Sequence, residues 1–209
     1  MRGNSHERTH MKRCLLIAAA AAWALCKPVW AAPVNFSDPY VELSVGVATG
    51  SNLAFDGVNA SLDSGPAASI GLGFARFVGP VDLRLDYMTT DRDTCFALSC
   101  IFGNQGVTSS STMLSALYNL PVGEGRWEAY VGAGAGMVKV EVENTGPGFS
   151  GSDNVFGWQL VGGARVRLFD WPIRLLVEYR YQSSQDAHVQ GHTVEYNSNS
   201  LAAGVRWTF

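Results

Sequence analysis

The segment Ser198-Asn-Ser-Leu-Ala-Ala-Gly-Val-Arg-Trp-Thr-Phe209 is the most informative part of the chain, because its residues alternate strictly in character and end on an aromatic side chain. The odd-numbered residues from Leu201 to Phe209 are apolar, and the even-numbered residues from Ser200 to Thr208 are polar or small. Successive side chains of a β-strand point to opposite faces, so this segment predicts a strand with one apolar face. An apolar face ending on Trp and Phe is typical of a strand in an outer-membrane barrel.

Seven further segments alternate in the same way, and each reaches the roughly ten residues with which a tilted strand crosses a membrane. They cover residues 40–49, 67–77, 81–89, 108–120, 127–142, 155–168 and 173–182. Short connections at 79–80, 121–126 and 169–172 alternate with long ones at about 50–66, 90–107, 143–154 and 183–197. This pattern predicts an all-β fold, an eight-stranded antiparallel up-and-down transmembrane β-barrel with periplasmic turns and four extracellular loops.

Alternation alone does not say which face of a barrel lies outward, since a soluble lipocalin-like barrel buries its apolar face. In this chain the apolar face carries the large side chains, whereas the other face is rich in Gly, Ala and Ser, as a narrow lumen requires. Aromatic residues also gather towards the strand ends, which is typical of membrane girdles. These aromatics are Tyr40, Phe77, Tyr87, Trp127, Phe156, Trp158, Tyr181, Trp207 and Phe209. Both features favour the membrane arrangement.

Charged residues of both signs interrupt the strands, and we expect them to line the lumen. They are Glu42, Asp82, Arg84, Asp86, Lys139, Glu141, Arg165, Glu178, Arg180 and Arg206. Such charges must pair, because an unpaired buried charge costs several kcal/mol. Two interpretations stay open: a pore with charged walls for small solutes, and an ion-paired plug. The narrow interior of an eight-stranded barrel favours the plug.

The first 31 residues are predicted to be upstream residues followed by a secretory signal peptide that is removed. Met11-Lys12-Arg13 is basic, residues 14–25 are apolar, and Val29-Trp30-Ala31 suits a cleavage site. The barrel domain would then be 32–209, with ten basic and 17 acidic residues and a net charge of −7. Because phosphate neutralisation needs basic patches, this charge argues against nucleic acid as a partner.

Few residues point to chemistry. Cys95 and Cys100 lie close together in a polar loop of an exported chain, which predicts a local structural disulfide bond. His6-Glu-Arg-Thr-His10 spells a zinc-protease motif but falls in the leader, and His188 and His192 share one loop without convergent ligands. No Ser, His and carboxylate set stands out for hydrolysis. We therefore expect neither an enzyme nor a bound metal or cofactor, and a loop-based outer-membrane enzyme stays the third alternative after the surface protein and the porin.

The chain resembles the small outer-membrane β-barrels related to the outer membrane protein A transmembrane domain and the opacity-type surface proteins. The similar segments are Tyr130-Val-Gly-Ala-Gly-Ala-Gly136, Gly157-Trp-Gln-Leu-Val-Gly-Gly163, Val177-Glu-Tyr-Arg-Tyr181 and Gly204-Val-Arg-Trp-Thr-Phe209. The resemblance implies an outer-membrane location, lipid contact and a structural or host-interaction role through the loops, with host surface molecules as partners. It also implies that Val205, Trp207 and Phe209 form a signal read by the barrel-assembly machinery.

Overall fold

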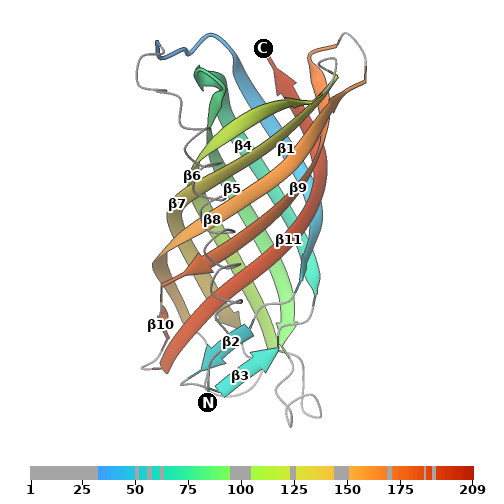
Figure 1. Ribbon diagram of the computed structural model, residues 1–209. Coiled ribbons are helices and arrows are strands. Elements are labelled where there is room, and N and C mark those ends of the chain that lie inside the picture. The colour runs from blue at the N-terminus through green and yellow to red at the C-terminus, as the bar shows by residue number, and fades with distance from the viewer. Residues whose placement is uncertain are drawn as a thin grey trace, which may run out of the picture. The chain divides into compact units, whose positions relative to one another are not determined.

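Eight long antiparallel strands form a closed barrel in the computed structural model (Figure 1), which describes residues 33–49, 52–55, 58–61, 64–94, 105–122, 126–143, 151–168, 171–185, 187–189 and 192–209. Each barrel strand pairs with the next one along the chain, and the last pairs with the first. The strands are β1 (Pro39–Thr49), β4 (Gly65–Val78), β5 (Val81–Thr94), β6 (Gln105–Val122), β7 (Trp127–Glu143), β8 (Gly151–Arg167), β9 (Ile173–Ser184) and β11 (His192–Thr208). The predicted all-β, eight-stranded antiparallel barrel is confirmed.

The final strand closes the barrel against the first. Val41 of β1 lies opposite Trp207 of β11, and the Phe209 amide donates a hydrogen bond of 2.9 Å to the Pro39 carbonyl. Closure removes the open sheet edge, whose backbone groups would find no hydrogen-bond partner in lipid. Among the described residues, no helix is long and apolar enough to cross a membrane.

Three short strands lie within two of the long connections. β2 (Asn52–Phe55) and β3 (Val58–Ser61) form a hairpin in the first, and β2 continues the pairing with β11. β10 (Ala187–Val189) pairs with β11 in the last. The segments expected to be plain loops at 50–66 and 183–197 therefore carry additional strand pairing.

Several strands continue beyond their predicted ends. β5 runs to Thr94 rather than residue 89, and β8 begins at Gly151 rather than residue 155. The ladder of backbone hydrogen bonds needs no apolar alternation, so polar residues extend it beyond the apolar band. Thr108 illustrates this, because its hydroxyl donates to the Asp91 carboxylate at 3.0 Å on the exposed face.

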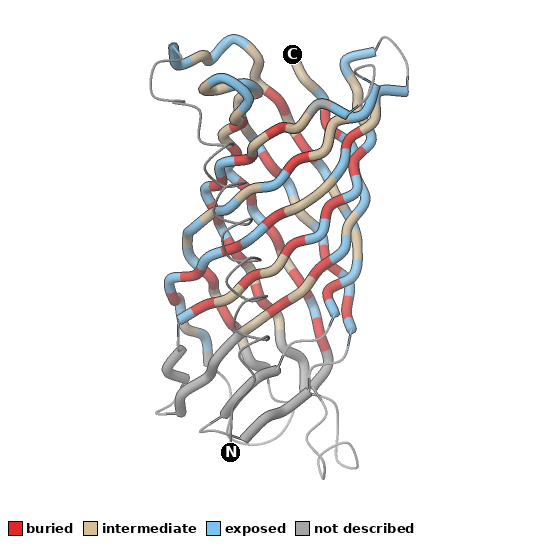
Figure 2. The backbone as a smooth tube through the Cα atoms, in the orientation of Figure 1, coloured by how far each residue is buried: buried red, intermediate tan, exposed pale blue. Residues whose placement is uncertain are grey.

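The two faces of the barrel are inverted relative to a soluble barrel. Buried and exposed residues alternate along each strand (Figure 2), and large apolar side chains point outward. Val45 is 70% exposed, whereas Arg84, Arg165 and Arg206 are almost completely buried inside. A soluble protein rarely buries arginines while exposing a continuous apolar wall. The exterior therefore suits hydrocarbon, and the polar core lies in the lumen.

A bulge shapes the end of the barrel that carries the short turns. The β4–β5 register shifts between Phe74 and Val78, and Arg76 within it adopts a positive φ of 51°. Such a bulge lets one strand carry an extra residue and bend. Residues 35–38 pack against it: Phe36 meets the rings of Phe74 and Phe77 edge-on, each at 5.2 Å between centroids.

Candidate functional site

Two tyrosines on opposite walls form the base of the lumen core. Tyr40 on β1 lies opposite Gly73 on β4, and Tyr130 on β7 lies opposite Gly163 on β8. A Cβ atom on Gly73 or Gly163 would approach the tyrosine ring to about 2.6 Å, so only glycine leaves room for the ring. The predicted place of Tyr40 in an outer girdle is wrong, since its ring is buried in the lumen.

Each tyrosine ring also supports an arginine. The Arg206 guanidinium lies 3.6 Å from the centroid of the Tyr40 ring, and that of Arg165 lies 3.8 Å from the centroid of Tyr130. The negative face of an aromatic ring attracts a cation at this distance, more strongly away from water. The two tyrosines thus fix the guanidinium groups that begin the ion-pair network.

The first part of the network joins Arg206 and Arg165 to Glu42 and Asp82. Arg206 contacts both acids, Glu42 through Nε at 2.5 Å and Asp82 through Nη1 at 2.6 Å. Arg165 approaches the same two carboxylates at 3.5 and 3.4 Å. Asn119 completes the group, because its amide donates to Asp82 at 2.6 Å and accepts from Arg165 at 2.9 Å. Two cations and two anions therefore neutralise one another.

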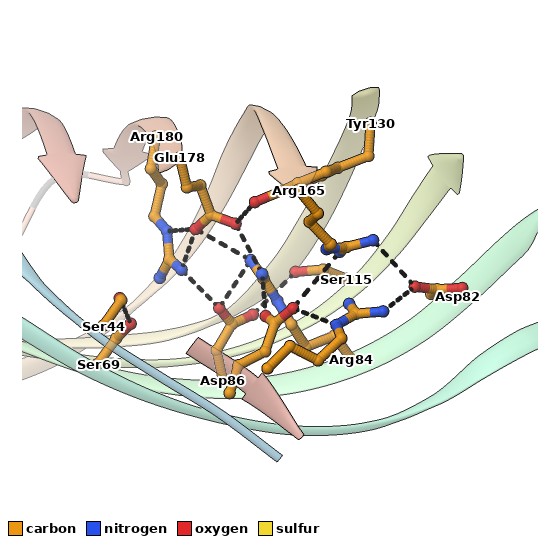
Figure 3. A network of polar contacts seen from close by, with 12 residues as sticks. Ser44, Ser69, Asp82, Arg84, Asp86, Ser115, Tyr130, Arg165, Glu178 and Arg180 are labelled. Atoms are coloured by element: carbon orange, nitrogen blue, oxygen red, sulfur yellow. Dashed lines mark hydrogen bonds and ion pairs between the residues drawn. The ribbon is translucent and has the colours of Figure 1, made fainter. Parts of the chain in front are cut away.

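The second part is centred on Arg84 (Figure 3). Its Nη1 donates to Glu42 at 2.8 Å and to Glu178 at 2.7 Å, so Arg84 links the two parts. Arg180 contacts Glu178 and Asp86 at 2.6 and 2.8 Å, and the Tyr130 hydroxyl donates to Glu178 at 2.9 Å. The complete network holds four arginines and four carboxylates, so its formal charges cancel.

Amide and hydroxyl groups continue the filling towards the long connections. Gln159 donates to Ser115 at 2.7 Å and to Asp86 at 3.2 Å, and Gln182 donates to Ser111 at 2.9 Å. Further along, Thr90 and Ser109 share a hydrogen bond of 2.7 Å, and Arg92 donates to Ser198. Most of these polar groups thus have a partner, as buried polar groups require.

Two of the ten charged residues that were predicted to line the lumen lie outside it. Lys139 and Glu141 on β7 pair with each other at 2.9 Å and are 43% and 42% exposed, outside the network. Their neighbours Val138 and Val140 are the buried residues of this strand. The β7–β8 register is unbroken, so side chains alternate regularly along β7 from the inward-facing Gly132, Gly134 and Gly136. Even-numbered residues of β7 therefore face the lumen, whatever their polarity. Met88, Met113 and these valines give the lumen an apolar section.

The eight remaining predicted charges are buried and brought together as described. Sequence reasoning missed Tyr40, Tyr130, Gln159 and Gln182 as members of the network. Position on the strand could have revealed Tyr40, Gln159 and Gln182, since each lies at an even spacing from a predicted lumen residue on the same strand. Tyr130 lies at an odd spacing from Lys139 and Glu141, so only its shared face with the inward glycines of β7 marks it. The interior gap beside Ser44, Ser69 and Arg180 has a volume of only about 10 Å³, about the least that holds one water molecule.

Other predicted residues lie outside the lumen or outside the described chain. Val205, Trp207 and Phe209 point outward and are exposed, and the rings of Trp207 and Phe209 stack at 5.9 Å. Cys95 and Cys100, the leader 1–31 and the side chains of His188 and His192 fall outside the described residues. The disulfide bond and the signal peptide stay predictions.

An apolar exterior, a closed antiparallel sheet and a charge-neutral polar lumen together define a transmembrane β-barrel. Comparison with known families agrees: the model of the outer membrane protein beta-barrel domain matches residues 14–209. The chain belongs to this family and is a protein of the bacterial outer membrane. No curated protein sequence matches the chain.

Solved structures show the same fold at low sequence identity. Neisserial surface protein A is 19% identical, with a TM-score of 0.62 over 82% of this chain and 97% of that one. The attachment invasion locus protein Ail of Yersinia pestis, solved with the heparin analogue sucrose octasulfate, is 18% identical, with a TM-score of 0.48 over 81% and 99%. OprG of Pseudomonas aeruginosa is 13% identical, with a TM-score of 0.49 over 82% and 95%. The likeness to the first shows the fold alone.

Proposed function

We propose that this outer-membrane barrel is a structural and surface-interaction protein that acts through its extracellular loops, with a lumen closed to solutes. The observation that carries the proposal is the charge-balanced network across the lumen, in which Arg84 joins Glu42, Asp86 and Glu178. A conducting pore needs a continuous water path, whereas these side chains contact one another directly. The rigid barrel then serves as a scaffold for loops, where binding residues commonly lie.

The alternative is a small-solute porin, and conductance in planar bilayers distinguishes the two. We expect the purified barrel to give no discrete conductance steps. A double variant, Arg84→Ser with Glu178→Ser, removes two side chains that meet across the lumen and should create conductance. Steps in the unmodified protein that disappear on Arg84→Glu or Arg180→Glu would support the porin instead. If neither the unmodified protein nor the double variant conducts, other side chains besides Arg84 and Glu178 also close the lumen. That result would still oppose the porin.

The loop role is tested by trimming one connection at a time. β5 ends at Thr94 and β6 begins at Gln105, so replacing residues 95–104 with a short Gly-Ser turn preserves the described strands. We expect binding to host cells or matrix to fall while heat-modifiable migration stays normal. Trimming 144–150 between β7 and β8 is the matched control. Unchanged binding after trimming every long connection would reject a loop-based role.

We also propose that Val205, Trp207 and Phe209 form an assembly signal for the barrel-assembly machinery. Two features support this proposal. The three residues share the outward face of β11, and this strand forms the seam with β1. No catalytic role is proposed for the chain.

A further inference from the structure

A polar vestibule opens at the end of the lumen that carries the short turns. Its volume is about 390 Å³, and the buried network forms its floor through Arg206, Asp82 and Asn119. Arg167 and Arg174 line one wall. In an outer-membrane barrel the short turns face the periplasm, so the vestibule is open to periplasmic solutes.

Three arginines lie side by side across this vestibule. Arg167 of β8 is the register partner of Arg174 of β9, and Arg174 is the register partner of Arg206 of β11. All three side chains line the same cavity. Like charges directly opposite on neighbouring strands destabilise a sheet, so this row is unfavourable unless anions compensate it.

The carboxylates of the vestibule compensate only part of this charge. Glu128 pairs with Arg174 at 2.6 Å, and Asp82 pairs with Arg206 at 2.6 Å. Asp38 is occupied by Arg76 of the bulge, at 2.5 Å. In the part of the chain that the structure describes, the lining thus holds four arginines and three carboxylates. Among the described residues, none forms an ion pair with Arg167.

A second observation is that donors in this arginine row are unused. The Nη2 atom of Arg206 is buried and has no hydrogen-bond partner among the described residues. Among the described residues, Arg174 hydrogen-bonds only to Glu128, through Nη1, and its other guanidinium donors are available. A planar guanidinium presents its N–H donors as a fork that matches carboxylate and phosphate oxygens.

We propose that the vestibule binds a small oxyanion of the periplasm, a phosphate- or carboxylate-bearing solute, between Arg167 and Arg174. One bound anion supplies the negative charge that the described lining lacks and relieves the repulsion along the arginine row. The cavity accommodates a small molecule, since ligand sites begin at roughly 300 Å³. The exposed side chain of Trp171 also lines the vestibule. This inference holds whether or not the lumen conducts.

The test is titration calorimetry of the folded barrel in phosphatidylcholine nanodiscs with inorganic phosphate, at low ionic strength and constant pH. We expect one phosphate per barrel and at least roughly tenfold weaker binding in Arg167→Gln, which removes the charge-assisted hydrogen bonds. Arg167 is exposed, so this variant should keep its heat-modifiable migration. Succinate as a second probe should compete with phosphate.

Lys139→Gln is the matched control, because it removes one exposed cation from the outer face of β7. It should bind phosphate as the unmodified protein does. Absence of binding heat at millimolar phosphate would overturn the proposal. So would equal weakening in the Arg167 and Lys139 variants, because binding would then reflect net charge rather than the vestibule.

Discussion

Arg84 donates two hydrogen bonds to Glu178 across the lumen, at 2.7 Å from Nη1 to Oε2 and 3.3 Å from Nη2 to Oε1. The first residue lies on β5 and the second on β9, four strands apart in either direction around the eight-stranded barrel. The pair therefore joins opposite walls. Because both side chains are buried, the pair links the two walls inside the lumen.

Replacing Arg84 with methionine should strongly destabilise the barrel. The variant removes the cation that pairs with Glu42, Asp86 and Glu178 and leaves these buried carboxylates incompletely neutralised. Breaking a buried ion pair costs about 3–5 kcal/mol. The free energy of unfolding in urea, measured in lipid vesicles, should fall by that amount. Lys139→Met removes an exposed cation and should cost below about 1 kcal/mol. Equal losses in both variants would contradict a structural role for the network.

The tyrosine–glycine contacts predict a sharp difference between two neighbouring glycines of β8. A Cβ atom at position 163 would lie 2.5 Å from the Tyr130 hydroxyl and 2.6 Å from the Val177 carbonyl oxygen, whereas nothing lies within 4 Å of one at position 162. Gly163→Ala should therefore lower the free energy of unfolding by about 1–3 kcal/mol through overpacking. Gly162→Ala should leave it nearly unchanged. Similar urea midpoints for the two variants would show that the Tyr130 side chain can adopt another conformation that accommodates the added methyl group.

Two rules predict from the sequence which residues of a strand face the lumen: the polarity of each side chain and the alternation along the strand. Alternation correctly places Glu42, Arg84 and Glu178 inside, because on their strands the polar face is also the inward one. On β7 polarity and alternation disagree, and Val138 is inward while Lys139 is outward. Geometry prevails there, since a strand without a bulge cannot exchange its faces.

The partners within the lumen could not be predicted from the sequence. Which carboxylate Arg84 meets depends on the shear of the closed sheet, which sets the heights of β5 and β9 relative to each other. The same shear brings Arg165 and Arg206 to Glu42, although these residues come from three different strands. Residue-by-residue alternation contains no information on these heights.

The apolar exterior predicts that the cost of an outward charge depends on its depth in the bilayer. Val177 is exposed in the middle of β9, and Val122 is exposed at the end of β6 beside a short turn. Val177→Arg should cost about 2–4 kcal/mol, and Val122→Arg about 0–1 kcal/mol. Urea unfolding in vesicles measures both values. A larger loss of unfolding free energy at position 122 than at position 177 would indicate that the bilayer midplane lies nearer to position 122.

Phe209→Ala separates assembly from stability. The substitution keeps the backbone hydrogen bond from residue 209 to the Pro39 carbonyl and removes the stacked ring beside Trp207. Since such an aromatic pair contributes about 0.5–1.5 kcal/mol, the purified variant should still fold into vesicles. If the ring is part of the signal read by the assembly machinery, the fraction that becomes heat-modifiable in cells should fall several-fold.

The matched control for that experiment is Phe36→Ala, because Phe36 is also an exposed aromatic at the rim and contacts the rings of Phe74 and Phe77. It should lose comparable ring contacts yet assemble at the normal rate in cells. Equal assembly defects in the two variants would mean that both aromatic residues act only as part of the membrane girdle, and not as an assembly signal. A defect confined to position 209, with normal folding in vesicles, separates recognition of the last strand from the stability of the finished barrel.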